Sequence, residues 1–508
     1  MLRPHCSPGV ALPDAAQQLP GSRLVGGPLT LTGLTLDSGA VRPGDLFVAL
    51  PGANTHGARF ASAAYKAGAW AVLTDPPGEA LLEEDLPRLV VKDLRAQLGA
   101  FAAWFYGHPA QQLKLVGVTG TNGKTTVAHL LAAALEPQFG PVALLGTIAA
   151  RVGGLQIPSQ RTTWEAPALQ AGFAAMVERG VKACVMEVSS HALDLHRVDG
   201  FQFDVAAFTN LSRDHLDYHQ TMERYFEAKA ELFTPAHARH GIVALADAWA
   251  LRLARQATIP IQTLSGPGSP AAADVRGQSA TNWRFTPGSA RISATSFQLE
   301  GPGTSLEAIA PLPGPYNLAN AALALTAALA VGANGPEAAK ALASVNNVPG
   351  RMELVPSGPG QPTVVVDYAH APESVAQALR ALRPHTAGQL IAILGAGGDR
   401  DHGKRELMGR AAAAEADLVY VTDDNPRSED PAKIRQAVLK GAGAKGVEVA
   451  DRGESIARAL KNAQETDTVV VLGKGHEATI DYGGVAHSHN DVAVASSVLL
   501  NHKQEGAL

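Results

Sequence analysis

Residues 117–126, Gly-Val-Thr-Gly-Thr-Asn-Gly-Lys-Thr-Thr, have the composition of a loop that binds phosphate. Apolar residues precede the run and recur at helical spacing after it, so the sequence predicts a strand, a glycine-rich turn and a helix. Backbone N–H groups of such a turn close around phosphate oxygens, Lys124 would reach the terminal phosphates, and the Thr125 hydroxyl would hold Mg²⁺. Gly117 stands one residue earlier than the strict spacing requires. The run still predicts ATP or GTP binding, because an ordinary turn does not explain Gly-Lys-Thr between a strand and a helix.

Three further residues are candidates for chemistry near this loop. Glu187 stands near the end of the apolar run 183–188, where a carboxylate could hold Mg²⁺; the alternative is a capping or solvent-exposed glutamate. His215 lies in the polar segment 210–217 and is a metal ligand, a base or, as for most loop histidines, a structural residue. Lys229 lies in a helical segment, and its position alone indicates a surface lysine.

The last third of the chain predicts a sheet that positions a second set of polar groups. Four apolar runs read as buried parallel strands, at residues 363–367, 390–394, 418–422 and 468–472. Helical segments are predicted between them, around 376–382, 407–414, 434–441 and 456–463. This alternation predicts a doubly wound α/β sheet, which binds ligands at the carboxyl ends of its strands. Polar groups follow all four strands and predict a binding face there: Asp367-Tyr-Ala-His370, Gly397-Gly-Asp-Arg400, Asp423-Asp-Asn-Pro-Arg427 and Gly473-Lys-Gly-His-Glu477.

The length and composition of the chain limit the classes of protein to which it can belong. The chain has 508 residues, enough for about three domains. Its net charge of -5 does not suggest a surface for nucleic acid. The two cysteines are too few for a disulfide framework, which favours a reducing compartment. The N-terminus lacks the continuous apolar core of a secretory signal, and the longest apolar stretch is too short to cross a bilayer, so we expect a cytoplasmic protein without membrane insertion.

The chain divides into three predicted domains, residues 1–110, 111–347 and 348–508. Short strand-like pieces and turns fill the first, and strands alternate with helices in the second. Residues 265–296 are rich in Gly, Pro, Ser and Thr and predict an excursion of loops and strands. An alanine-rich helix is expected after Asn317.

Several of these segments together resemble the Mur ligases of peptidoglycan synthesis, and the resemblance covers nearly the whole chain. The segments that carry it are residues 117–126, 186–192, 210–217, 225–233, 314–320 and 348–353. Residues 37–38, 43–50, 397–401 and 403–405 narrow it to the members that add a diamino acid to UDP-N-acetylmuramoyl-L-alanyl-D-glutamate.

The resemblance implies a three-domain architecture: an N-terminal domain for the uridine nucleotide, a central P-loop ATPase, and a C-terminal doubly wound α/β domain for the incoming amino acid. It implies that Thr125, Glu187 and His215 serve Mg²⁺ and that Lys124 holds phosphate. It also implies a carbamylated Lys229, an anionic oxygen ligand, in place of a surface lysine. The implied ATP-binding residues are Gly117, Thr119, Gly120, Thr121, Asn122, Gly123, Lys124, Thr125, Thr126, Asn317, Asn320, Arg351, Asp367 and His370. The implied UDP-substrate contacts are Leu36, Ser38, Thr162, Thr163, Ser189 and Arg197.

The choice of amino acid depends on Arg427, because arginine can hold a carboxylate with two parallel hydrogen bonds. In the family this pattern accompanies meso-diaminopimelate, whose distal end carries a carboxylate and an amine; L-lysine and L-ornithine lack that carboxylate. The alternative is that Arg427 makes a salt bridge within its own loop. The implied amino-acid site is Arg400, Asp424, Asn425, Pro426, Arg427, Gly473 and Glu477.

The implied reaction is an ATP-dependent ligation through an acyl phosphate, carried out by a monomer without a nucleic-acid partner. Two rival functions remain: a folylpolyglutamate-synthase-like ligase that shares the ATPase core, and a P-loop regulatory protein that ligates nothing. The polar groups that follow the four strands in the last third of the chain disfavour the regulatory protein, because a nucleotide switch needs no amino-acid pocket.

Overall fold

The computed structural model describes residues 2–6, 9–52, 54–159, 161–270 and 282–505. The chain forms two compact units. The first comprises Met1–Thr286, Leu299–Leu306 and Asn320–Leu342, and the second comprises Pro287–Gln298, Glu307–Ala319 and Ala343–Leu508. No helix in the described part of the chain is long and apolar enough to cross a membrane.

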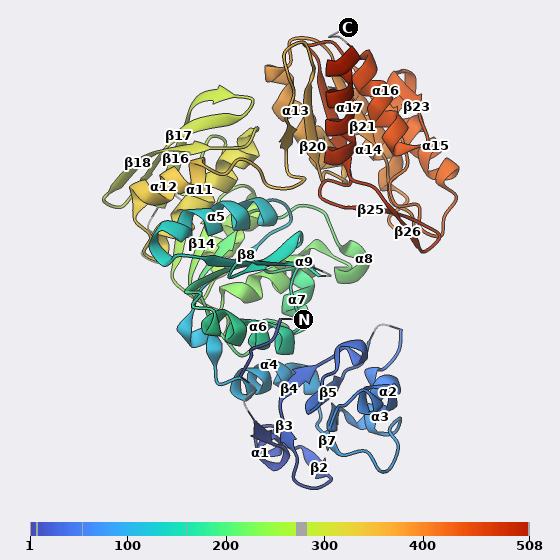
Figure 1. The fold of residues 1–508 in the computed structure, drawn as a ribbon. Coiled ribbons are helices and arrows are strands. Elements are labelled where there is room, and N and C mark those ends of the chain that lie inside the picture. Colours follow the sequence, from blue (N-terminus) through green and yellow to red (C-terminus); the bar gives the residue numbers. More distant parts are fainter. Residues whose placement is uncertain (1, 7–8, 53, 160, 271–281, 506–508) are drawn as a thin grey trace. The chain divides into compact units, whose positions relative to one another are not determined.

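A five-stranded sheet forms from the N-terminal residues of the first unit (Figure 1). Its strands, in the order β2-β7-β6-β5-β4, are β2 (Arg23–Val25), β7 (Arg88–Val90), β6 (Ala71–Thr74), β5 (Asp45–Ala49) and β4 (Gly33–Thr35). β4 to β7 are parallel and β2 is antiparallel. A separate pair joins β1 (Val10–Ala11) to β3 (Thr30–Leu31). The helices here are α1 (Leu12–Gln17), α2 (Ala61–Lys66), α3 (Pro76–Glu79) and α4 (Leu94–Phe105).

An eleven-stranded sheet follows, and its middle carries the phosphate loop. Its order is β11-β10-β9-β12-β8-β13-β14-β15-β16-β17-β18. The strands are β8 (Lys114–Thr119), β9 (Val142–Leu145), β10 (Ala149–Val152), β11 (Leu155–Pro158), β12 (Ala183–Glu187), β13 (Phe203–Phe208), β14 (Ala238–Ala244), β15 (Ile261–Ser265), β16 (Asn282–Arg291), β17 (Ala294–Gly301) and β18 (Thr304–Ala310). β9, β12, β8, β13, β14 and β15 are parallel neighbours, so their carboxyl ends meet at one edge.

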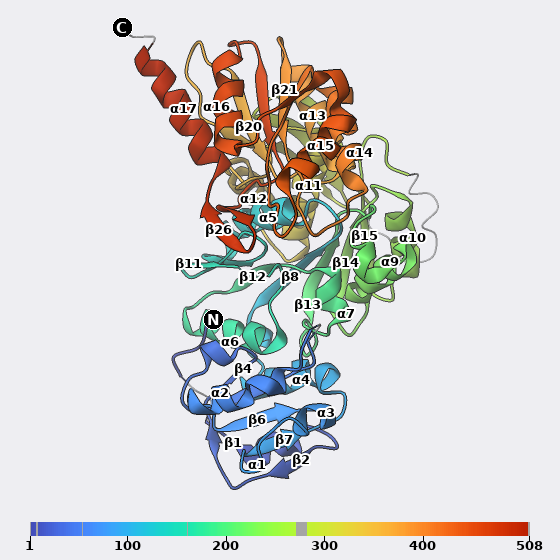
Figure 2. The same cartoon turned by 90° about the vertical axis from the view of Figure 1, so that its right-hand side faces the viewer.

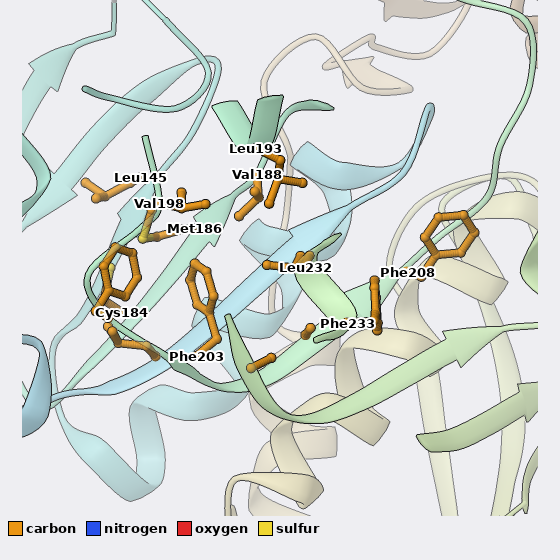
Figure 3. Packing of buried hydrophobic residues seen from close by; sticks show 14 of the residues in the cluster. Leu145, Cys184, Met186, Val188, Leu193, Val198, Phe203, Phe208, Leu232 and Phe233 are labelled. Carbon is orange, nitrogen blue, oxygen red and sulfur yellow. The ribbon is translucent and has the colours of Figure 1, made fainter. Parts of the chain in front are cut away.

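The helices of this region are α5 (Lys124–Phe139), α6 (Ala166–Glu178), α7 (Ser190–Asp194), α8 (Leu216–His219), α9 (Met222–Ala230), α10 (Ala248–Gln256), α11 (Pro315–Ala330) and α12 (Gly335–Ala343). Apolar side chains of the strands form a buried core on one face of the sheet. Met186, Phe203 and Phe208 pack there with Leu193 of α7 and Phe233 (Figure 3). Buried apolar surface of this extent contributes about 25 cal/mol per Å² and holds the strand ends in fixed positions.

A six-stranded sheet forms the core of the second unit (Figure 2). Its order is β19-β20-β24-β21-β22-β23, with β19 (Glu353–Val355), β20 (Thr363–Asp367), β24 (Thr468–Leu472), β21 (Leu390–Leu394), β22 (Leu418–Val421) and β23 (Gly446–Glu448). All neighbours are parallel except β19, which is antiparallel to β20. A hairpin of β25 (Thr479–Tyr482) and β26 (Val485–Ser488) follows.

Each strand of this sheet alternates between two cores, because successive side chains point to opposite faces. α13 (Pro372–Leu382), α14 (Lys404–Glu415) and α15 (Pro431–Ala442) cover one face. α16 (Arg452–Asn462) and α17 (Asp491–Glu505) cover the other. The predicted doubly wound α/β sheet and its four parallel strands are confirmed; the short edge strands β19 and β23 were not predicted.

The excursion predicted at residues 265–296 contains strand β16 and the start of β17, while residues 271–281 lie outside the described part of the chain. The alanine-rich helix α11 begins at Pro315, three residues before its predicted start after Asn317.

Candidate functional site

The phosphate loop connects the end of β8 to the start of α5, as predicted. Two of its glycines have positive φ, 142° at Gly120 and 86° at Gly123. A Cβ atom at Gly120 would lie 1.9 Å from the Thr209 hydroxyl oxygen. Only glycine fits there, because both the backbone angle and the space exclude a side chain. Gly117 lies within β8, where a Cβ atom would approach the Phe203 ring to 3.1 Å.

Lys124 is the first residue of α5, and its ammonium group lies over the loop. Nζ donates to the carbonyl oxygens of Gly120 at 3.0 Å and Thr121 at 2.9 Å. This position suits a cation that meets the terminal phosphates of a nucleotide held by the loop.

Glu187 is the last residue of β12 and is buried, which excludes the solvent-exposed alternative. The Thr125 hydroxyl donates to its Oε2 at 2.9 Å. Thr147, a residue that was not predicted, donates to Oε1 from its backbone N–H at 2.8 Å and to Oε2 from its hydroxyl at 3.1 Å. Nothing in the local sequence marks Thr147, because it reaches Glu187 only after the strands pair.

The Thr125–Glu187 pair fits Mg²⁺, which prefers oxygen ligands and is usually held by one or two protein groups together with substrate phosphates. In the described part of the chain no group of three or more His, Cys, Asp or Glu side chains is arranged to hold a metal ion by itself.

Replacing Thr147 with valine removes the hydroxyl bond to Glu187 but keeps the shape of the side chain. We expect the Mg²⁺ concentration for half-maximal phosphate release from ATP to rise about ten- to a hundredfold, as for the loss of one hydrogen bond to a charged group. Thr74→Val is the matched control, because this buried hydroxyl binds the Ala49 carbonyl in the five-stranded sheet. An unchanged Mg²⁺ requirement in Thr147→Val would show that the hydroxyl does not orient Glu187.

Lys229 lies in the last turn of α9 and is only 2% exposed, so the surface position suggested by the helix alone is wrong. Its Nζ donates to the Gly120 carbonyl at 2.8 Å and lies 4.7 Å from the Tyr225 ring centre. Burial, followed by the nearby Lys124 ammonium, lowers the pKa of Lys229 well below its ordinary value. A lowered pKa increases the share of Lys229 that is in the neutral, reactive amine form.

His215 lies near the same loop, at the N-terminus of α8. Burial, together with Lys124 and Lys229 among other neighbours, lowers the pKa of His215 to about 4. The imidazole is therefore neutral at neutral pH, the form in which histidine binds metals. The Asp214 carboxylate acts in the opposite direction on both His215 and Lys229, since it raises their pKa values.

The predicted UDP-substrate residues fall into two groups. Thr163, Ser189 and Arg197 lie together: the Thr163 hydroxyl donates to the Glu187 backbone carbonyl at 2.9 Å, the Ser189 N–H donates to that hydroxyl at 3.1 Å, and Arg197 Nη1 lies 3.4 Å from the Thr163 carbonyl oxygen.

Thr162 lies in the same region, and its hydroxyl oxygen is 3.1 Å from the hydroxyl oxygen of Thr147. Leu36 and Ser38 follow β4, which is an edge strand of the five-stranded sheet. The roles of both groups remain predictions.

Of the two asparagines on α11, Asn320 lies against the phosphate loop. A Cβ atom at Gly123 would be 2.5 Å from its Oδ1 atom, so Asn320 closely covers the turn. Asn317 is buried, and its amide donates to the Pro313 carbonyl at 2.8 Å.

Arg351, Asp367 and His370 lie in the second unit. The Arg351 guanidinium stacks 4.6 Å from the Tyr368 ring centre. Asp367 accepts hydrogen bonds from the backbone N–H groups of Met352 and Ala369, each at 2.8 Å. Burial raises the pKa of Asp367, although Arg351 and these N–H groups oppose the shift.

The predicted amino-acid residues Asn425 and Glu477 come together at the carboxyl edge of the six-stranded sheet. Asn425 Nδ2 donates to Glu477 Oε2 at 2.9 Å. Lys474, which was not predicted as a site residue, is fully buried and donates to Asn425 Oδ1 at 3.1 Å and to Glu477 Oε2 at 2.8 Å. Burial would raise the pKa of Glu477, but Lys474 and the Asn425 amide lower it below its ordinary value.

The other predicted amino-acid residues surround this pair. A Cβ atom at Gly473 would lie 2.7 Å from Asp424 Oδ2, so glycine leaves room for that carboxylate. Pro426 packs against Gly398, where a Cβ atom would meet its carbonyl oxygen. Arg427 has a φ of 53°, and its guanidinium donates to the Gly398 carbonyl.

Among the described residues, Arg427 forms no salt bridge within its own loop; its guanidinium bonds a backbone carbonyl instead. Arg400 is exposed.

Arg452 lies beneath these loops and is fully buried. It pairs with Asp491 at 2.7 Å and donates to the carbonyl oxygens of Leu472 at 2.9 Å and Asp423 at 3.4 Å. Those two residues directly precede Gly473 and Asp424. One side chain therefore holds the two chain segments that carry the amino-acid motifs, and this role of Arg452 was not predicted.

Three family models match the chain in order. They are the "Mur ligase family, catalytic domain" at residues 30–106, the "Mur ligase middle domain" at 118–328, and the "Mur ligase, glutamate ligase domain" at 350–475. A relative from Streptomyces coelicolor named UDP-N-acetylmuramoyl-L-alanyl-D-glutamate–2,6-diaminopimelate ligase is 47% identical over 495 residues, which cover 95% of this chain and 93% of the relative.

Solved structures agree with these matches. A diaminopimelate ligase of the same name is 33% identical with a TM-score of 0.63, covering 93% of this chain and 96% of that one. A folylpolyglutamate synthase from Mycobacterium tuberculosis is more distant, at 19% identity, a TM-score of 0.58 and coverage of 78% and 93%, and shares the fold. Matches over nearly the whole length, at this level of identity, show that the chain belongs to the Mur ligase family.

Proposed function

We propose that the protein is an ATP-dependent amide ligase of peptidoglycan precursor synthesis. It joins meso-diaminopimelate to UDP-N-acetylmuramoyl-L-alanyl-D-glutamate and forms ADP and phosphate. The diaminopimelate ligase name of the 47% identical relative supports this substrate pair. The greater distance of the folylpolyglutamate synthase disfavours the first rival function.

One observation carries the proposal. Asn425, Arg427 and Glu477 lie on loops that meet at one edge of the six-stranded sheet, where the Arg427 N–H donates to the Asp481 carbonyl and the Asp481 N–H donates to Asn425 Oδ1. A cationic and an anionic side chain on neighbouring loops suit the distal carboxylate and ammonium of diaminopimelate. A regulatory P-loop protein would need no such pair.

The chemistry follows from the charges. A carboxylate is a poor electrophile, so ATP phosphorylates the D-glutamyl side-chain carboxylate to an acyl phosphate. The neutral amine of the diamino acid attacks this carbonyl, and phosphate leaves from the tetrahedral intermediate. Lys124 offsets the repulsion between the substrate carboxylate and the ATP phosphates, and it stabilises the charge on the transferred phosphoryl group.

Mg²⁺, when bound, supplies positive charge that stabilises the phosphate oxygens. Thr125, Glu187 and His215 would hold it, joined by Lys229 as a carbamate. The lowered pKa of Lys229 supports that modification, because only a neutral amine adds CO₂. We propose further that the enzyme acts as a cytoplasmic monomer, with the nucleotide, ATP and amino-acid roles divided among residues 1–110, 111–347 and 348–508.

The test is ATP-dependent phosphate release with UDP-N-acetylmuramoyl-L-Ala-D-Glu and, separately, meso-diaminopimelate, L-lysine and L-ornithine. We expect turnover with diaminopimelate and little with the other two. Turnover with lysine or ornithine alone would keep the ligase and overturn the role of Arg427. ATP hydrolysis that needs neither cosubstrate would overturn the ligase itself.

A further inference from the structure

We propose that Lys474 determines amino-acid specificity by setting the net charge of the amino-acid pocket. Its buried cation offsets the negative charge of Glu477 and so favours a zwitterionic distal group over a cationic one. This inference rests on the proposed ligase function and adds a residue that does not itself need to contact the amino acid.

Lys474 is held in a fixed position. Its side chain has no exposed surface, and Nζ donates to Glu477 Oε2 at 2.8 Å and Asn425 Oδ1 at 3.1 Å. A second donor, the Asp481 N–H at 2.9 Å, fixes the same Asn425 oxygen. The amide therefore turns its nitrogen toward Glu477, and one cation orients both polar side chains of the pocket.

The proposed amino-acid site contains two carboxylates, Asp424 and Glu477, and two arginines, Arg400 and Arg427, of which Arg427 donates to the Gly398 carbonyl. Lys474 adds one positive charge to this set, directly beside Glu477. Removing Lys474 therefore makes the pocket more negative by one unit charge.

Two other cations near the pocket form salt bridges with different carboxylates. Arg452 pairs with Asp491 at 2.7 Å, although its charge also acts on Asp424 and Glu477, and Arg435 pairs with Asp423. Among the described residues, Lys474 is the cation found in a salt bridge with Glu477.

Net charge matters because the candidate amino acids differ in it. The distal end of diaminopimelate carries an ammonium and a carboxylate and sums to zero, whereas the distal end of lysine or ornithine carries an ammonium alone. A pocket with excess negative charge attracts the cationic distal group more strongly, whereas a neutral pocket with separated charges suits the zwitterion. Lys474 donates to Glu477 and to the neutral Asn425 amide, so its charge acts chiefly on the Glu477 carboxylate.

The experiment compares kcat/KM for meso-diaminopimelate and L-lysine in the wild type and in Lys474→Met. Assays at about pH 8.5 keep Glu477 ionised in both proteins, since this is about four units above an ordinary glutamate pKa. We expect the diaminopimelate-to-lysine ratio to fall at least about tenfold, the effect of one unit charge at close range in a solvated pocket. Both amino acids are measured on one preparation, so any unfolded fraction cancels from the ratio.

The double variant Lys474→Met/Glu477→Gln removes one charge of each sign and so keeps the net charge of the wild-type pocket. We expect its diaminopimelate-to-lysine ratio to return toward the wild-type value, although both kcat/KM values fall because an ammonium acceptor is lost. A purely structural role for Lys474 would not give this recovery.

The outcomes separate the two proposals. A wild type that ligates no diamino acid overturns the proposed function. A wild type that ligates diaminopimelate, with a Lys474→Met variant that keeps the wild-type ratio, overturns only the role of Lys474. A ratio that stays low in the double variant overturns the charge-balance explanation.

Discussion

Lys229→Met is expected to lower kcat/KM for the ligation at least about a thousandfold, the loss seen when a group that stabilises transition-state charge is removed. The reason is its position: the amine is buried, bonded to the Gly120 carbonyl and lowered in pKa. Methionine fills the same space but cannot form a carbamate. Initial rates of phosphate release, with all three substrates present, measure the effect.

Bicarbonate provides an independent readout for this lysine. Activity of the wild type should fall when dissolved CO₂ is removed and recover when bicarbonate is added. Lys66→Met is the matched control, because Lys66 also lies in the last turn of a helix, α2, but is exposed. Near wild-type activity in Lys229→Met would exclude both the carbamate and a role in phosphate chemistry.

Arg452→Met is expected to destabilise the second unit by about 3–5 kcal/mol, because it leaves the Asp491 carboxylate buried without its cation. It also removes the donors to Leu472 and Asp423, so KM for the amino acid should rise in the fraction that folds. All five tryptophans belong to the first unit. Urea unfolding followed by tryptophan fluorescence therefore reports the first unit, whereas circular dichroism reports both.

Two variants test whether burial causes this effect. Arg380 pairs with Glu415 at 2.7 Å, the same distance as the Arg452 pair, but its side chain is 57% exposed. Arg380→Met should therefore unfold close to the wild type. Arg452→Met/Asp491→Leu removes both buried charges and should recover much of the stability, while the rise in KM persists. Equal losses in Arg452→Met and Arg380→Met would contradict the argument.

The elements that follow hydrophobic periodicity could be predicted from the sequence. Strands β20, β21 and β24 have the predicted bounds, because continuous runs of Val, Ile and Leu fit only a strand buried on both faces. β19 and β23 have three residues each and are half-exposed, so their sequences lack this pattern. Strands were predicted within residues 265–296 without bounds, and the structure gives them as β16 and β17.

Residues of the candidate site could be predicted most directly where neighbours in one sequence motif have the same function. Lys124 and Thr125 stand together in one motif, and the structure brings them to one loop. Thr147, Lys474 and Arg452 act on partners 40, 3 and 39 positions away, through bonds that exist only after folding. Lys474 lies inside a predicted motif, but its neighbours do not reveal that its charge is buried.

The residues around the phosphate loop and those around Glu477 share no strand and belong to different sheets. The first set lies on β8, β12 and their following loops, and the second follows β22 and β24. Mutations can therefore accumulate independently in the two parts of the gene. Under the proposed function, selection acting on residues after β22 and β24 would change which amino acid is joined while the phosphate loop stays the same, so chimeric ligases could exchange this part of the gene.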